Sequence, residues 1–328
     1  MRRSNKIKQL ASLVAVLLLV IIMLYSGLQI LEATLLNSGS NANTGFVSKT
    51  ITRNGVDYYP RRDITVLMFL GIDQMGPVED SGLFTNPGAA DAVMLMIFDE
   101  KNQTTTVLQL NRDTMVNMPI LGIGGREAGT MYAQLALAHT YGSGLEDSCI
   151  NTRKTVSNLL GDVSIDYYIA MNMGAVGILN DAVGGVTVTV TDDFSDVDPT
   201  ISMGEVTLHG EQALTFVQDR KNVGDQINAT RMKRQKMYVE SFREKFLENM
   251  NQGVGFVIDT YSEVAPYLVS DCPIDTLSAM IERYDDYEFA GVITPEGDNI
   301  LGETYYEFYA DEEKLDELVM ELFYAPKR

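Results

Sequence analysis

The chain has 328 residues, of which 45% are hydrophobic and 21% are charged, so it is long enough and apolar enough to fold around a full core. Its 45 acidic and 25 basic residues give a formal net charge of −20. This charge argues against nucleic acid as a partner, because affinity for duplex DNA depends on cations that displace counterions. His139 and His209 are the two histidines of the sequence, so a histidine-based triad or zinc site has almost no material.

An apolar segment near the N-terminus predicts a membrane anchor. Residues 9–31 carry no charge and are long enough to span a bilayer with some tilt. The cations before this segment are Arg2, Arg3, Lys6 and Lys8. They predict that residues 1–8 are cytoplasmic and that the rest is extracellular. A cleavable signal peptide is the alternative, but the run is long for one and no small-x-small cleavage site clearly follows it. We therefore expect a single-pass protein of the cell membrane.

Strands and helices alternate along the rest of the chain. Residues 32–62 include a Gly-, Ser- and Asn-rich stretch that predicts an extracellular spacer, and residues 63–328 are expected to form one domain. Short apolar or alternating runs predict strands at 64–72, 93–98, 104–110, 167–171, 186–191 and 288–294. Amphipathic patterns predict helices at 130–142, 146–160, 173–182, 210–217, 229–250, 254–268, 274–284 and 310–323. This alternation predicts an α/β fold with a mixed central sheet and helices on both faces.

Two acidic residues lie at the ends of apolar strands. Asp73 directly follows the run 64–72, and Asp91 comes just before the strand at 93–98. Either residue alone is typical of a solvated turn. Together, on neighbouring strands, they could hold Mg²⁺, with Mn²⁺ as the alternative ion. Magnesium sites commonly combine one or two carboxylates with phosphate oxygens of the substrate.

Arginines follow two of the predicted elements. Arg112 lies in Asn-Arg-Asp-Thr (111–114) at the end of the strand 104–110. Its guanidinium can pair with Asp113, or it can fork onto phosphate oxygens. Arg220 follows the helix at 210–217. These arginines are candidates for binding an anion.

The segment 231–236 places four cations in the first turns of the long helix predicted at 229–250. A helix N-terminus already carries partial positive charge and favours anions. Gln235 falls within the apolar stripe of this helix, Arg231 lies at its edge, and Arg234 lies further round. The crowding of cations in an acidic chain predicts a bound anion here, and phosphate is the best candidate.

Other residues have two interpretations each. Cys149 and Cys272 can pair in an oxidising exterior or remain separate buried thiols. His139 lies in a helical Ala-Leu-Ala-His pattern and is expected to be structural. The tyrosine pairs at 58–59, 167–168 and 305–306 favour strand and packing positions over a carbohydrate-binding platform.

Several short motifs follow one another in a characteristic order. After the anchor they are Leu-Gly-Ile-Asp (70–73), Asp91, Asn-Arg-Asp-Thr (111–114), Ile-Asp-Tyr-Tyr (165–168), Leu-Asn-Asp-Ala-Val-Gly-Gly-Val (179–186), Leu-His-Gly-Glu-Gln-Ala-Leu (208–214), Asp-Arg-Lys (219–221) and Arg-Met-Lys-Arg-Gln (231–235). This order resembles the LytR–CpsA–Psr family of cell-wall enzymes over roughly residues 63–250.

The resemblance implies an extracellular phosphotransferase. Such enzymes move a polyprenyl-pyrophosphate-linked glycopolymer, of the teichoic acid or capsule kind, onto peptidoglycan through a phosphodiester. Mg²⁺ assists at the pyrophosphate, and the lipid tail lies in a hydrophobic tunnel. By the same resemblance, Asp73 and Asp91 are the metal-side carboxylates, and Asp113 is the partner of Arg112. The catalytic residues are Arg112, Asp113 and Arg220. The pyrophosphate-binding residues are Arg112, Arg220, Arg231, Arg234 and Gln235.

The chain departs from the family pattern at three polar positions. Ala89 and Ala90 stand where the family usually has Arg-Ser before the acid, Gln134 begins a segment that usually starts with Lys, and Asn228 replaces an acid. The missing arginine favours an alternative function, a non-catalytic anchored protein that binds polyprenyl phosphates and organises wall assembly. Catalysis is favoured by four intact residues, Asp73, Asp91, Arg112 and Arg220. A transcriptional regulator fits neither the charge nor the predicted topology.

Overall fold

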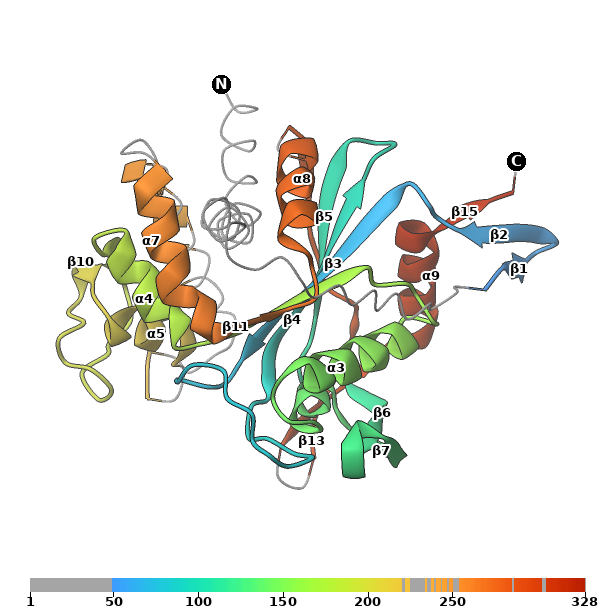
Figure 1. Cartoon of the computed structure of the whole chain (residues 1–328), viewed down its shortest axis with the longest axis horizontal. Coiled ribbons are helices and arrows are strands. Elements are labelled where there is room, and N and C mark those ends of the chain that lie inside the picture. Colours follow the sequence, from blue (N-terminus) through green and yellow to red (C-terminus); the bar gives the residue numbers. More distant parts are fainter. Residues whose placement is uncertain are drawn as a thin grey trace, which may run out of the picture. The chain divides into compact units, whose positions relative to one another are not determined.

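The computed structural model describes residues 49–219, 222–224, 234, 237–238, 240–242, 244–246, 248–249, 254–284, 286–302 and 305–327 (Figure 1). These residues fall into two compact units. The predicted single extracellular domain over 63–328 stays a prediction. The larger unit contains residues 49–172, 268–272 and 286–327, and the smaller contains 173–267 and 273–285. Within the described ranges, no helix is both long enough and apolar enough to cross a membrane. The predicted anchor at 9–31 lies outside them.

The larger unit is built on a six-stranded mixed sheet. Its strand order is β11-β8-β3-β4-β5-β12. Antiparallel pairs join β3 to β4, β4 to β5 and β11 to β8, and parallel pairs join β3 to β8 and β5 to β12. The bounds are β3 Ile64–Ile72, β4 Ala90–Asp99, β5 Thr104–Leu110, β8 Tyr167–Asn172, β11 Leu268–Ser270 and β12 Glu288–Ile293. This confirms the prediction of an α/β fold with a mixed sheet.

Both faces of the central strands are buried. Met68, Leu70 and Leu95 belong to one hydrophobic core with helices α3 (Glu146–Leu159) and α9 (Glu312–Phe323). Side chains of the opposite face, such as Leu67 and Met96, are also buried. Strands covered on both faces read as continuous apolar runs, which is why the sequence located β3 and β4. Burial of each large aliphatic side chain contributes about 1.5–3 kcal/mol.

Two hairpins and a small sheet surround the central sheet. Strands β6 (Met115–Leu121) and β7 (Glu127–Gln134) pair antiparallel, as do β13 (Gly297–Leu301) and β14 (Tyr306–Ala310). Strands β1 (Ile51–Arg53), β2 (Val56–Pro60) and β15 (Tyr324–Pro326) form a three-stranded sheet, so residues 51–60 of the predicted spacer are structured.

The helix predicted at 130–142 was wrong. Its first part lies in β7, and residues 135–140 form the 3₁₀-helix η2. Ala, Met and Gln favour helices, but pairing with β6 decides the conformation because tertiary context overrides weak local propensity.

The smaller unit is mainly helical. Its helices are α4 (Ala175–Ala182), α5 (Glu211–Gln218), α7 (Val254–Val264) and α8 (Ile274–Tyr284), with the 3₁₀-helix η3 (Ala265–Tyr267) and the hairpin β9 (Val186–Val190) and β10 (Gly204–Leu208). Described residues between 234 and 249 are helical, as predicted for 229–250. Their buried stripe follows a spacing of four through Arg234, Tyr238, Phe242 and Phe246. A cation therefore occupies a core position of this helix.

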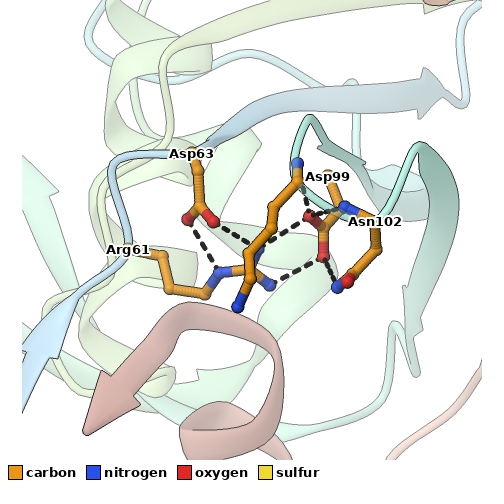
Figure 2. A network of polar contacts seen from close by, with 5 residues as sticks. Arg61, Asp63, Asp99 and Asn102 are labelled. Carbon is orange, nitrogen blue, oxygen red and sulfur yellow. Dashed lines mark hydrogen bonds and ion pairs between the residues drawn. The ribbon is translucent and has the colours of Figure 1, made fainter. Parts of the chain in front are cut away.

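An ion-pair network lies at the end of the sheet where β3 begins and β4 ends. Figure 2 shows Arg61 between the carboxylates of Asp63 and Asp99. Its guanidinium donates to both oxygens of Asp99 at 2.8 and 2.7 Å, and to both oxygens of Asp63 at 3.0 and 3.1 Å. Asn102 donates its backbone N–H and its amide group to Asp99 at 3.0 and 2.7 Å. The network ties the turn after β4 to the segment before β3.

The Asp99 carboxylate should make stability depend on pH in the acid range. Burial alone would raise the pKa of Asp99, but the hydrogen bonds from Arg61 and Asn102 outweigh it and lower the pKa to about 2. Because the folded pKa lies below the unfolded value of 3.8, the stabilisation is complete above pH 3.8 and is lost as the pH falls through about 2.

Urea unfolding between pH 7 and pH 2 checks this prediction. The wild type should lose more stability across the acid interval than Asp99→Asn, whereas Asp298→Asn, a change at an exposed position, should follow the wild type. Parallel pH profiles for the wild type and Asp99→Asn would contradict it.

Candidate active site

The sheet register gathers the predicted acids and Arg112 at one end of the larger unit. Ile72 of β3 pairs with Ala90 of β4, and Val93 of β4 pairs with Leu110 of β5. Asp73 follows β3 immediately, and its backbone N–H donates to Ala89 at 2.9 Å. Three neighbouring strands therefore place Asp73, Asp91 and Arg112 at the same end of the sheet.

Arg112 lies between two carboxylates. Its Nη1 forms an ion pair with Asp91 Oδ1, and its Nε lies 3.5 Å from Asp113 Oδ1. The Arg112 side chain is 41% exposed, while that of Asp91 is 16% exposed. The two acids hold the guanidinium in place, and its exposed portion remains accessible to an anion.

Local hydrogen bonds shape the turn that presents Arg112. The Asn111 side chain accepts from the Asp113 N–H at 3.0 Å. The Asn111 carbonyl accepts from the Thr114 N–H at 3.1 Å and from the Thr114 hydroxyl at 2.6 Å. An Asx-type turn of this kind ends the strand sharply, which is why an Asn precedes the arginine. The turn fixes Asp113 beside Arg112.

Gln134 and the C-terminal hairpin β13–β14 also reach this site. The sequence marked Gln134 only as a departure from the family pattern and gave no sign of the hairpin. The Gln134 amide donates to Asp113 Oδ1 at 3.0 Å and to the Tyr306 carbonyl at 2.7 Å. The Asp113 carbonyl accepts from the Phe308 N–H at 2.9 Å. No sequence pattern connects residue 113 with residue 308. The one available signal was Gln134, at a position where the family pattern is polar.

The carboxylate oxygens at this end of the sheet suit a hard divalent cation. Asp73 is exposed, and one carboxylate oxygen of Asp91 forms an ion pair with Arg112. Among the described residues, no group of three or more His, Cys, Asp or Glu side chains converges to hold a metal. Two carboxylates fit Mg²⁺ when phosphate oxygens of a substrate complete its coordination. The predicted roles of Asp73 and Asp91 as metal ligands stay predictions.

Arg234 lies in the smaller unit and is buried. Its Nη1 donates to Asp192 at 2.7 Å, its Nε donates to the Phe216 carbonyl at 3.0 Å, and its Nη2 donates to the Asp219 carbonyl. The guanidinium also lies 5.2 Å from the ring centroid of Phe194. These contacts hold the segment that ends at Asp219, next to residue 220. The predicted pyrophosphate contact of Arg234 stays a prediction. Arg220, Arg231 and Gln235 lie outside the described residues.

His139 and Cys149 are structural. His139 is buried, its Nδ1 lies 2.7 Å from the Gly88 carbonyl, and its Nε2 lies 3.8 Å from Cys149 Sγ. Burial lowers the pKa of His139 and raises the pKa of the Cys149 thiol, so both groups are neutral at pH 7. Cys149 and Cys272 are not paired with each other. The expectation of a structural histidine is confirmed.

Known proteins of similar sequence agree with the family that the motifs suggest. The chain is 30% identical over 183 residues to the polyisoprenyl-teichoic acid–peptidoglycan teichoic acid transferase TagT of Bacillus subtilis, a match that covers 53% of this chain and 51% of that one. It is 26% identical over 281 residues to TagU of Bacillus licheniformis, covering 84% and 82%. The chain thus spans about half the length of TagT.

The fold agrees as well. The crystal structure of B. subtilis TagT superposes with a TM-score of 0.53 at 25% identity, covering 80% of this chain and 90% of that one. Residues 34–323 match the LytR_cpsA_psr family. That match covers most of the sequence, and the chain belongs to the LytR_cpsA_psr family.

Proposed function

We propose that this protein transfers a polyprenyl-pyrophosphate-linked anionic glycopolymer, of the teichoic acid or capsule kind, to peptidoglycan through a phosphodiester. The observation that carries the proposal is the partly exposed side chain of Arg112, whose guanidinium lies between Asp91 and Asp113 at one end of the sheet. The relatives TagT and TagU are named polyisoprenyl-teichoic acid–peptidoglycan teichoic acid transferases.

The reaction needs positioning and charge neutralisation more than covalent help from the protein. A hydroxyl oxygen of the acceptor sugar attacks the phosphorus next to the glycopolymer. The new phosphorus–oxygen bond forms as the bond to the bridging pyrophosphate oxygen breaks. Polyprenyl monophosphate leaves, and the hydroxyl proton passes to water. Negative charge grows on the phosphate oxygens in the transition state, where a preorganised guanidinium stabilises it.

In this proposal, Arg112 binds the pyrophosphate and Asp113 orients Arg112. The family resemblance assigns pyrophosphate-binding roles to Arg220, Arg231, Arg234 and Gln235 as well. Asp73 and Asp91 would hold Mg²⁺, or Mn²⁺ in its place. The bound ion would supply further positive charge at the pyrophosphate. Gln134 donates to the same Asp113 oxygen that lies near Arg112 and acts as a positioning residue.

The proposal includes the location of the protein. Residues 9–31 would anchor it in the cell membrane with a cytoplasmic N-terminus, so that the enzyme faces the wall and the lipid-linked donor. Helices would cover both faces of the sheet and leave room for the prenyl chain.

A reconstituted transfer assay tests this function. The full-length protein in detergent would be mixed with Mg²⁺, a polyprenyl-pyrophosphate-linked oligosaccharide and peptidoglycan. We expect polyprenyl monophosphate to be released and the oligosaccharide to become attached to peptidoglycan through a phosphodiester. EDTA should stop the reaction, and added Mg²⁺ or Mn²⁺ should restore it. Activity that is unchanged in EDTA would contradict the metal assignment.

The second candidate function is non-catalytic binding of polyprenyl phosphates to organise wall assembly. Ala89 favours it, because an alanine stands where the family pattern has an arginine and so supplies no second cation near Asp91. In the same assay this function predicts tight retention of the lipid-linked donor without release of polyprenyl monophosphate. Absence of both binding and release would contradict both functions.

A further inference from the structure

A cavity of about 390 Å³ lies beside the Arg112–Asp113 turn in the larger unit. Its walls come from the start of β6, from β7, the end of α3, β14 and α9. Its polar lining residues include Thr114, Tyr132, Asn158, Tyr309, Glu312 and Asp316. Small-molecule sites typically start near 300 Å³, so this cavity has the size for one or two sugar units.

Two exposed tyrosines face this cavity. Tyr132 is 53% exposed and Tyr309 is 37% exposed, although single tyrosines of a hairpin usually pack their rings. The Tyr309 hydroxyl donates to Glu307 at 2.6 Å, which restrains the ring. A tyrosine offers a flat apolar ring and a polar tip, a combination that suits the C–H faces and hydroxyls of a sugar.

Hydrogen bonds and shared strands connect the cavity to the candidate active site. Thr114 lines the cavity and is the last residue of the turn that presents Arg112. Gln134 joins Asp113 to Tyr306, and Tyr309 follows three residues along the same strand. At about 3.3 Å per strand residue, Tyr309 lies roughly 10 Å from that junction along β14. A bound oligosaccharide could therefore extend from the cavity to Arg112.

The charge of the cavity selects its occupant. Among its described lining residues, Glu312 and Asp316 are acidic and none is a cation. Arg53 pairs with Asp316. Residues 297–310 of the neighbouring hairpin carry three acids and no Lys, Arg or His. An anionic phosphate polymer would meet repulsion here, whereas an uncharged sugar would not.

We propose that this cavity binds an uncharged N-acetylhexosamine unit of the acceptor glycan and directs its neighbour toward Arg112. The choice of acceptor rests on the proposed function. Tyr132 and Tyr309 would stack on the sugar, and Asn158 would lie beside its polar groups.

Binding of chitotetraose, an uncharged tetramer of N-acetylglucosamine, tests the proposal without any donor. The full-length protein would be titrated by calorimetry in detergent. Tyr132→Ala and Tyr309→Ala should each weaken binding about tenfold, because each loses a stacking contact. Tyr132→Phe and Tyr309→Phe keep the ring and should stay within about twofold of the wild type, which also shows that the sites still fold. Tyr59→Ala removes a tyrosine of similar exposure outside the cavity and should bind like the wild type.

A glycerol-phosphate oligomer serves as the anionic comparison. Absence of chitotetraose binding to the wild type, equal binding by all variants, or binding of the phosphate oligomer in preference would each overturn the proposal. In the transfer assay, the Tyr132→Ala defect should fall mainly on the KM for peptidoglycan. A wild type that never cleaves the donor would refute the proposed function, but the chitotetraose titration would still decide this inference.

Discussion

Arg112→Ala should slow release of polyprenyl monophosphate by about 10²–10³-fold, the usual loss when one preorganised donor to a developing negative charge is removed. Arg112 is suited to this role because two acids hold it in place while part of its side chain stays exposed. The loss should appear in kcat, since the charge on the phosphate oxygens grows in the transition state. Arg112→Lys keeps the charge but loses the planar fork, so we expect an intermediate rate.

Arg126→Ala is the matched control for this experiment. Arg126 is an exposed arginine of the same unit, and its removal should leave the rate at the wild-type value. Urea unfolding of Arg112→Ala should stay close to that of the wild type, because partly exposed ion pairs contribute about 0–1 kcal/mol. If Arg112→Ala keeps more than one-tenth of the wild-type rate, the assignment of Arg112 to the reaction centre is wrong.

Asp271→Ala should lower the free energy of unfolding by about 3–5 kcal/mol, the cost of removing one partner from a buried ion pair. Arg153 of α3 is 5% exposed at its side chain, and its Nη1 donates to Asp271 at 2.6 Å. The other Asp271 oxygen accepts from the Tyr168 N–H of β8 at 2.7 Å. The substitution therefore leaves a buried cation and a strand N–H without this acceptor. The carboxylate thus ties α3 and β8 to the residue that follows β11.

The control is the ion pair formed by the next residue of α3. Lys154 pairs with Glu127, and the two side chains are 38% and 44% exposed. Glu127→Ala should change the unfolding free energy by less than about 1 kcal/mol. Asp271→Asn keeps an acceptor for Tyr168 and should fall between the two. Arg153→Leu combined with Asp271→Ala should recover part of the loss, because no charge is then left buried. Equal effects of Asp271→Ala and Glu127→Ala in urea unfolding would contradict this account.

The sequence located the elements whose patterns are local. Apolar runs identified β3, β4 and β5 because strands buried on both faces leave a continuous hydrophobic signal. The helices α3 to α5 and α8 followed from their amphipathic periodicity. The ordered motifs identified the family, and the positions of Asp73, Asp91 and Arg112 at strand ends marked the candidate site.

Tertiary contacts decided the rest. Strand β7 has a composition that favours helix, and only its pairing with β6 makes it a strand. The contacts of Arg234 with Asp192, Phe194 and Phe216 were not predictable from local patterns, because packing between distant segments brings these residues together. The C-terminal hairpin reaches Asp113 across nearly two hundred residues of sequence. Local patterns report backbone preference and burial, but which polar groups meet depends on sheet register and packing, and these involve residues far apart along the chain.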